Sequence, residues 1–200
     1  MNFQGKVVLV TGATRGIGKA IAQTFVSRGA TVVGTATSES GAAAISEYLG
    51  EAGTGLVLNV TEQASIDALF AAIKAKYGEV DILINNAGRS IRRAVHESID
   101  RFHDFERTMQ LNYFGAVRLV LNVLPHMMQR KDGQIINISS IGVLANATRF
   151  SAYVASKAAL DAFSRCLSAE VHSHKIAITS IYMPLVRTPM IAPTKMYKYV

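Results

Sequence analysis

A short apolar segment that leads directly into a glycine-rich loop and then into a helix restricts the fold of this chain more than any other feature. The segment from Lys6 to Thr11 is almost wholly apolar and β-branched, which is typical of a strand buried on both faces. Glycines follow at positions 12, 16 and 18, and helical periodicity begins at Ile17. A loop of this kind turns tightly and brings a helix N-terminus close to a pyrophosphate. The segment therefore predicts a dinucleotide-binding unit.

Five more apolar segments of strand length alternate with amphipathic helical patterns along the rest of the chain. The predicted strands cover residues 31–35, 56–58, 80–84, 134–138 and 176–181, and the later predicted helices cover residues 41–49, 66–73, 101–124 and 152–172. Strands that alternate with helices at this spacing form right-handed crossovers and a parallel sheet. We predict an α/β chain in which residues 1–200 form one domain, a Rossmann-type doubly wound parallel sheet of six strands with helices on both faces, in three layers.

The composition excludes several classes of protein. Half of the residues are hydrophobic, which excludes a disordered chain, and no apolar run reaches the roughly 18 residues of a membrane span. The first residues lack the layout of a signal peptide, so we expect a cytoplasmic protein. The formal charge of +7 is scattered without aromatic–basic alternation, so we expect anionic cofactors and acyl carriers as partners, no nucleic acid and no metal. Cys166, the single cysteine, is predicted to pack in the core.

Tyr153 and Lys157 carry the clearest chemistry in the sequence. They are four residues apart, so on a helix they share one face, and an ammonium group there favours ionisation of the phenol. A free tyrosine titrates near pH ~10, too high for efficient proton transfer near neutrality unless a positive charge lies close. Ser140 precedes the tyrosine by thirteen residues, so its hydroxyl could hold a carbonyl oxygen that Tyr153 protonates. Taken alone, the Tyr-x-x-x-Lys spacing also occurs by chance in many helices.

The end of the second predicted strand bears on the choice of cofactor. It reaches Ala36, where an NAD-binding unit usually places an acidic residue for the ribose 2′-hydroxyl, and neither Thr37 nor Ser38 is acidic. Their hydroxyls, together with Arg15 in the glycine loop, would suit a 2′-phosphate, which favours NADP(H). The alternative is that Arg15 is only a solvated loop residue. Asn59, after the third strand, is a candidate contact for the adenine.

Five ordered motifs resemble those of the short-chain dehydrogenase/reductases. They are Thr11-Gly12-x-x-x-Gly16-Ile17-Gly18, Asn85-Asn86-Ala87-Gly88, Asn112, Ser140 with Tyr153-x-x-x-Lys157, and Pro184. The resemblance implies that NADP(H) is held by Gly12, Arg15, Gly16, Ile17, Gly18, Thr37, Asn59, Val60, Asn86, Ala87, Gly88, Tyr153, Lys157, Pro184, Val186 and Thr188. Where the family usually has a glycine after the proline, this sequence has Leu185.

The same resemblance implies four catalytic roles. Tyr153 would donate the proton, and Lys157 would lower the pKa of that phenol and hold the nicotinamide ribose. Ser140 would orient the substrate carbonyl, and Asn112 would support a proton-relay water. Asn112 also lies in an apolar helical pattern, where a polar amide needs a hydrogen-bond partner.

Finer resemblances divide the chain at Gly88. Residues 1–88 resemble bacterial 3-oxoacyl-acyl-carrier-protein reductases, and residues 89–200 resemble the reductase domains of bacterial fatty acyl-CoA reductases. The chain is therefore either a divergent natural relative or a chimera joined at the shared Asn-Asn-Ala-Gly turn. Both resemblances imply that the substrate is an acyl thioester on acyl carrier protein or CoA.

We expect NADPH-dependent reduction of a 3-oxoacyl thioester to the 3-hydroxyacyl thioester, as in fatty acid synthesis. The alternatives are a fatty acyl-CoA reductase that forms an aldehyde and, in another class, an inactive cofactor-binding fragment or chimera. Members of the family usually continue with a seventh strand and a substrate-covering segment, so the domain is predicted to be truncated at its C-terminus. The resemblance also implies a homodimer or homotetramer that associates through the helices of residues 101–124 and 152–172.

Overall fold

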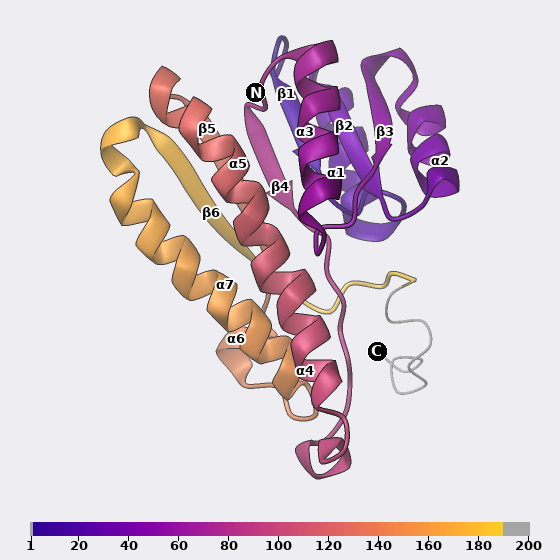
Figure 1. Cartoon of the computed structure of the whole chain (residues 1–200), viewed down its shortest axis with the longest axis vertical. Coiled ribbons are helices and arrows are strands. Elements are labelled where there is room, and N and C mark those ends of the chain that lie inside the picture. The colour runs from indigo at the N-terminus through magenta and orange to yellow at the C-terminus, as the bar shows by residue number, and fades with distance from the viewer. Residues whose placement is uncertain (1, 190–200) are drawn as a thin grey trace.

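The computed structural model describes residues 2–189, and its centre is one six-stranded sheet (Figure 1). The strands are β1 Val7–Val10, β2 Thr31–Ala36, β3 Gly53–Val57, β4 Ile82–Asn85, β5 Gly133–Ser140 and β6 Ile176–Met183. Their order across the sheet is β3-β2-β1-β4-β5-β6, and every pair is parallel. The predicted doubly wound α/β fold is confirmed. Because the chain moves one way from β1 to β3 and the other way from β4 to β6, the ligand crevice is expected where β1 and β4 end.

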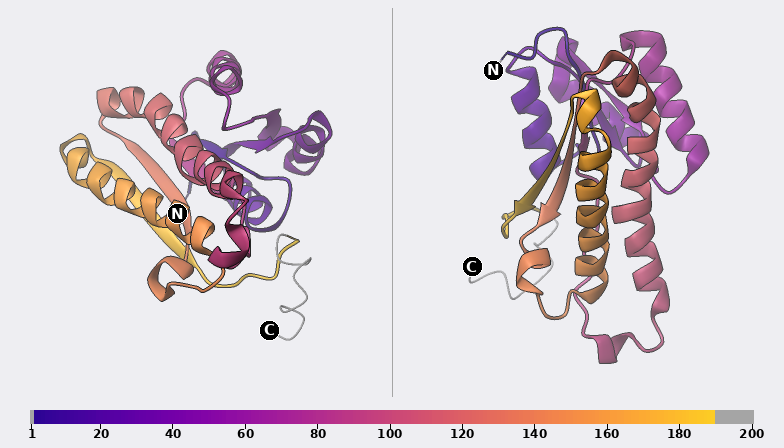
Figure 2. Two further views of the ribbon diagram at one scale, coloured as in Figure 1. Left: turned by 60° about the horizontal axis from the view of Figure 1, so that its bottom comes forward. Right: turned by 90° about the vertical axis from the view of Figure 1, so that its left-hand side faces the viewer.

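Helices cover both faces of this sheet, as Figures 1 and 2 show. They are α1 Gly16–Val26, α2 Glu39–Leu49, α3 Gln63–Tyr77, α4 Phe102–Met109, α5 Gly115–Arg130, α6 Gly142–Ala145 and α7 Ser151–Glu170. Short 3-10 helices occupy Gly50–Ala52, Val95–Ser98 and His172–His174. Helices α1 and α2 pack on one face, and α3, α5 and α7 pack on the other. This arrangement gives the three layers that the alternating pattern predicts.

Strand β1 shows how the apolar sequence fills two cores at once. Leu9 belongs to the core under α3, α5 and α7, whereas its neighbours Val8 and Val10 belong to the core under α1 and α2. All three side chains are fully buried. Successive side chains of a strand point to opposite faces, so a strand covered on both sides must be apolar at every position.

Helix α5 differs most from the sequence expectation. The predicted helix of residues 101–124 was wrong at its C-terminal end, because α5 continues through Pro125 to Arg130. A proline removes one hydrogen bond from a helix, but the fully buried Met127 beyond it packs against the sheet and keeps the helix in place. The helical region is also interrupted, since a π-helical turn, Gln110–Phe114, separates α4 from α5.

Smaller differences have equally local causes. Strand β3 begins at Gly53, three residues before its predicted start at residue 56. The missed residues include Gly55, which has to be glycine because an added Cβ would lie 1.9 Å from the Ala42 carbonyl oxygen in α2. The short helix α6 was not predicted. Cys166 was predicted to pack in the core and is exposed instead, since α7 buries Leu160, Ser164 and Leu167 on its other face. The predicted absence of the family's seventh strand concerns the chain after β6, of which only the part up to residue 189 is described, so the predicted truncation stays a prediction.

Candidate active site

The glycine loop is shaped by contacts that leave no room for side chains. Gly12 and Gly16 have φ values of +65° and +58°, which favour glycine. A Cβ on Gly18 would lie 2.3 Å from the Gly12 carbonyl oxygen and 2.5 Å from Asn86 Nδ2. Beyond this turn α1 begins at Gly16, so its unpaired N–H groups face a pocket of about 220 Å³. The loop therefore forms a cradle that fits a pyrophosphate.

The end of β4 holds this loop from the side. Thr11 Oγ1 accepts hydrogen bonds from the backbone N–H groups of Asn86, at 3.0 Å, and Ala87, at 2.9 Å. Asn86 Nδ2 donates to the carbonyl oxygens of Thr11, at 2.9 Å, and Gly12, at 3.1 Å. The Asn-Asn-Ala-Gly turn and the glycine loop are thus one unit, and Gly88 lines the neighbouring pocket that contains Tyr153 and Lys157.

The residues predicted to contact a 2′-phosphate also gather near the loop. Arg15 and Thr37 are exposed, while the hydroxyl of Ser38 caps α2 by accepting a hydrogen bond from Gly41 N–H at 3.1 Å. A Cβ added to Gly41 would lie 3.1 Å from Thr14 Cγ2, so the first turn of α2 packs directly on the glycine loop. This packing brings the N-terminus of α2 close to Arg15.

Asn59 and Val60 form the turn after β3. Asn59 Oδ1 accepts hydrogen bonds from the N–H and the hydroxyl of Thr61, and its Nδ2 donates to Glu62 at 2.7 Å. Val60 is buried against Gly115, where an added Cβ would meet its side chain at 2.6 Å. The Asn59 amide therefore stabilises its own turn, and its predicted adenine contact stays a prediction.

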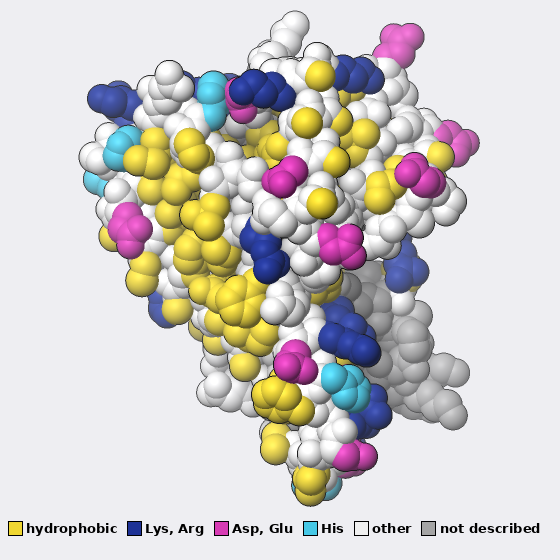
Figure 3. All heavy atoms as spheres, viewed as in Figure 1, with side chains coloured by type: hydrophobic (Ala, Val, Ile, Leu, Met, Phe, Trp, Pro, Cys, Tyr) yellow, Lys and Arg dark blue, Asp and Glu magenta, His cyan; other side chains and the backbone are white. Residues whose placement is uncertain are grey.

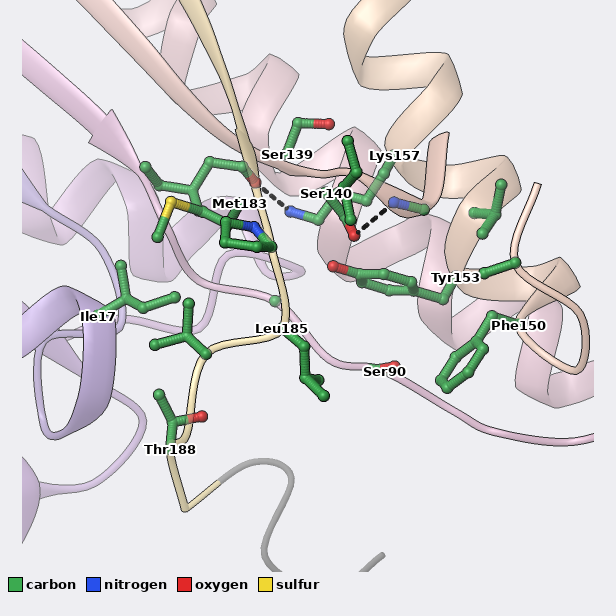
Figure 4. Close-up of a pocket in the computed structure, with 18 of the residues that line it drawn as sticks. Ile17, Ser90, Ser139, Ser140, Phe150, Tyr153, Lys157, Met183, Leu185 and Thr188 are labelled. Carbon is green, nitrogen blue, oxygen red and sulfur yellow. Dashed lines mark hydrogen bonds between the residues drawn. The ribbon is translucent and has the colours of Figure 1, made fainter. Parts of the chain in front are cut away.

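Ser140, Tyr153 and Lys157 line one pocket of about 240 Å³ at the carboxyl ends of the strands (Figure 4). Strand β5 delivers Ser140 and α7 delivers the other two, with the Tyr153 hydroxyl directed toward the Ser140 side chain. Ser140 Oγ accepts a hydrogen bond from Gly142 N–H at 3.1 Å. Because Ser140 only accepts in this bond, its own hydroxyl hydrogen can be donated to the Tyr153 hydroxyl or, in its place, to a ligand.

Burial is the largest cause of the pKa shifts of Tyr153 and Lys157. It raises the pKa of the Tyr153 phenol, and the hydrogen bond with Ser140 acts in the opposite direction but is the smaller effect. Burial also lowers the pKa of Lys157 to about 8, while Lys157 Nζ donates to the Ile138 carbonyl oxygen at 2.7 Å. Burial and the hydrogen bond with Ser140 are the two causes of the shift at Tyr153, so the predicted lowering of the phenol pKa by Lys157 stays a prediction.

Asn112 lies in the π-helical turn and joins three segments. Its Oδ1 accepts a hydrogen bond from Arg89 N–H at 2.9 Å, and its Nδ2 donates to the Arg89 carbonyl oxygen and to Ser156 Oγ, both at 2.9 Å. Ser156 in turn donates to the Tyr153 carbonyl oxygen at 2.7 Å. The expected hydrogen-bond partner of this amide is confirmed. Sequence reasoning missed Ser156, although its position directly before Lys157 was a signal.

A second chain of buried amides lies behind the pocket and was also missed. Asn85 Nδ2 donates to Asn137 Oδ1 at 2.8 Å, and Asn137 Nδ2 donates to Ser164 Oγ at 2.8 Å. All three residues are buried. The chain ties β4, β5 and α7 together, which explains polar residues in strands that are otherwise apolar.

The segment after β6 completes the pocket wall. Pro184, Val186 and Thr188 line the catalytic pocket together with Ile17. A Cβ on Gly16 would lie 3.2 Å from the Thr188 methyl group, so this segment lies against the glycine loop. Leu185 also lines the pocket, and Figure 4 shows its side chain beside those of the wall. Among residues 2–189 no group of three or more His, Cys, Asp or Glu side chains could hold a metal ion.

A doubly wound sheet, a glycine cradle and a serine–tyrosine–lysine pocket define a class of oxidoreductase. Residues 6–197 match the short chain dehydrogenase family, and the chain belongs to that family. Its cofactor is a nicotinamide dinucleotide.

Curated relatives include reductases of two kinds. A fatty acyl-CoA reductase of Acinetobacter baylyi is 70% identical over 100% of this chain and 68% of its own length. One from Mycobacterium tuberculosis is 46% identical over 98% of this chain and 68% of its own length. The 3-oxoacyl-acyl-carrier-protein reductase of Escherichia coli is 45% identical over 95% of this chain and 77% of its own length. Both kinds of similarity therefore run through Gly88 rather than stopping at it.

A solved structure supports the fold. A short-chain dehydrogenase from Streptomyces avermitilis superposes with a TM-score of 0.86 at 38% identity, over 92% of this chain and 68% of that protein. Within residues 2–189, no helix combines the length and the hydrophobicity needed to cross a bilayer.

Proposed function

We propose that this chain is an NADPH-dependent reductase that acts on the carbonyl group of an acyl thioester. The observation that carries the proposal is the convergence of Ser140, Tyr153 and Lys157 in a pocket whose other walls are mostly apolar, as an acyl chain requires. Incubation with NADPH and a thioester tests it. Cofactor oxidation supports the proposal, whereas cofactor binding without oxidation supports the rival function, an inactive cofactor-binding protein.

The glycine cradle fits the pyrophosphate of the cofactor, because added Cβ atoms would fill it. When bound, the nicotinamide supplies the hydride. Tyr153 donates a proton to the carbonyl oxygen, and Ser140 donates a hydrogen bond to the same oxygen. Lys157 uses one N–H on Ile138, so two others remain for the hydroxyl groups of the ribose.

Asn112 has fewer free hydrogen-bonding groups than its predicted role with a proton-relay water suggests. Both Nδ2 hydrogens are used by Arg89 and Ser156, so a proton-relay water would have to donate its hydrogen to the remaining lone pair of Oδ1. We propose that Asn112 holds the pocket in shape first and supports this water second.

A preference for NADPH over NADH rests on Arg15, Thr37 and Ser38 at the junction of the glycine loop and α2. Arg15 is exposed and makes no ion pair within the described part of the chain. An arginine bonded to a phosphate contributes roughly 1.5–3 kcal/mol, or about ten- to a hundredfold in affinity. Titration with both cofactors tests the preference, and equal affinities would remove it.

Two carbonyl groups compete as the site of reduction. The relative that is 70% identical favours the thioester carbon itself, with an acyl thioester, NADPH and a proton giving an aldehyde, a thiol and NADP. The catalytic triad and the Escherichia coli relative favour the 3-oxo group, whose reduction gives an alcohol and NADP. We place aldehyde formation first, because the similarity is higher and spans the catalytic half. Product analysis decides: free aldehyde supports this order, and a 3-hydroxyacyl thioester reverses it.

We also propose that the chain associates through α4, α5 and α7. Phe114 and Leu121 are exposed apolar residues of this region, at 42% and 57% of their full accessibility. Figure 3 shows apolar side chains gathered along α5 and beside α7. A homodimer or homotetramer would bury this surface. Sedimentation of Leu121→Asp against the unaltered chain tests the assembly.

A further inference from the structure

Two arginines stand at the outer edge of the catalytic pocket. Arg89 lines the pocket, and Arg149 directly precedes Phe150, which lines it as well. The two segments are joined, because Arg93 N–H donates to the Arg149 carbonyl oxygen at 2.7 Å. Figure 4 places Ser90 and Phe150 on the same side of the pocket, beyond the Tyr153 ring. Arg89 and Arg149 therefore belong to two joined segments that border the pocket on this side.

Their guanidinium groups differ from those nearby. Arg93 and Arg101 both pair with Asp104, at 3.3 Å and 3.2 Å. Arg89 and Arg149 are exposed, and within residues 2–189 neither side chain makes a hydrogen bond or a close ion pair, while the Arg149 charge helps to lower the pKa of the Glu97 carboxyl.

Arg89 is also held in place at its backbone. Asn112 binds both its N–H and its carbonyl oxygen, at 2.9 Å each. The starting point of this side chain is therefore fixed relative to the catalytic residues.

We propose that Arg89 and Arg149 bind the phosphate of the phosphopantetheine arm that carries the acyl group. The inference rests on the proposed acyl thioester substrate. With the reacting carbonyl at Tyr153, the thioester arm leaves the pocket past these two residues. Guanidinium groups match phosphate oxygens in geometry and charge, and their exposed position leaves them accessible to it. CoA and acyl carrier protein share this phosphate.

The experiment compares thioesters with and without the phosphate. KM is measured for an acyl-CoA and for the N-acetylcysteamine thioester of the same acyl group, using Arg89→Ala, Arg149→Ala and the double variant. We expect KM for the CoA thioester to rise roughly threefold in each single variant and about tenfold in the double variant, since each exposed charge contributes modestly. KM for the cysteamine thioester, kcat and the Kd for NADPH are expected to stay unchanged. Arg28→Ala, an exposed arginine at the far end of α1, is the matched control.

Binding measurements separate this inference from the proposed reaction. Pantetheine, 4′-phosphopantetheine and CoA are titrated into the NADP-bound protein. Weaker binding of 4′-phosphopantetheine to the double variant than to the unaltered chain supports the inference, whether or not a thioester is turned over. A lack of turnover would overturn only the reductase proposal. Equal binding of pantetheine and 4′-phosphopantetheine would overturn the inference, as would discrimination only by the 3′-phosphate of CoA. Kinetics with acyl carrier protein thioesters then show which carrier presents the phosphate.

Discussion

The cofactor side and the catalytic side of the pocket are held by different kinds of contact. In the glycine loop, Ala13 N–H donates to the Thr35 carbonyl oxygen at 2.9 Å, and the Tyr48 hydroxyl donates to the Ala13 carbonyl oxygen at 2.7 Å. These contacts join elements that follow one another within the first fifty residues. On the catalytic side, Asn112 connects Arg89, the π-helical turn and Ser156, which lies 44 positions away. The hydrogen bonds of the cofactor cradle, including those of the Thr11 and Asn86 side chains, thus each have a backbone partner, whereas the catalytic side also contains buried bonds between two side chains.

The largest expected effect separates chemistry from binding. Tyr153→Phe removes the only proton donor that the proposed mechanism uses, so kcat should fall by about a thousandfold, within the usual range for a general acid. Because the cradle does not involve the phenol, the Kd for NADPH should change less than about twofold. Stopped-flow kinetics and cofactor titration measure the two quantities. If Tyr153→Phe kept most of its rate, Tyr153 would not be the proton donor.

The next effect tests whether side chains hold the catalytic side. Asn112→Ala leaves the N–H and carbonyl oxygen of Arg89 without their partner and removes the donor to Ser156 Oγ, which should lower the free energy of unfolding by about 2–4 kcal/mol. Urea denaturation measures the loss. The control is Asn122→Ala, whose exposed amide donates to the Arg118 carbonyl oxygen of its own helix. Similar losses of stability in both variants would contradict the conclusion that buried side chains stabilise the catalytic side.

Burial of Lys157 predicts a pH dependence of stability. Its folded pKa of about 8 lies below the ordinary value of 10.5, so between these values the unfolded chain binds more protons than the folded chain. The free energy of unfolding should therefore rise with pH, by about 1.5 kcal/mol from pH ~8 to ~9.5. Urea titrations across this range test the rise, and Lys157→Met should flatten it. A steady fall over the same range in the unaltered chain would show that the ammonium is not buried.

The smallest expected effect concerns the cofactor cradle. Tyr48→Phe removes one hydrogen bond to Ala13, a net contribution of about 1 kcal/mol, so the Kd for NADPH and for NADH should each rise roughly fivefold. Turnover at saturating cofactor should be unchanged, because Tyr48 lies outside the catalytic pocket. Tyr77→Phe, on α3, serves as the control. A change in kcat without a change in Kd would place Tyr48 in a different role.

Local patterns were sufficient for most of the fold. The six strands were predicted because apolar, mostly β-branched residues predominate in each predicted segment, as in a sheet covered on both faces. Pro125 and Cys166 were misjudged for one reason: local signals for a helix end and for burial were overruled by the packing of their neighbours. Gly53 and Gly55 hid the start of β3, because glycine is rare in strands unless another backbone comes close.

The sequence by itself determined which motif follows each strand. Those motifs were enough to predict the glycine cradle, the tyrosine–lysine pair and the family. It did so because these features depend on short spacings and on residue types that few other folds need. Only the tertiary structure decided that Asn112 uses both its N–H groups, that Ser156 and the Asn85–Asn137 pair support the pocket, and that burial raises the pKa of Tyr153. Hydrogen-bond partners and desolvation depend on which distant segments meet, and a linear spacing carries no information about that meeting.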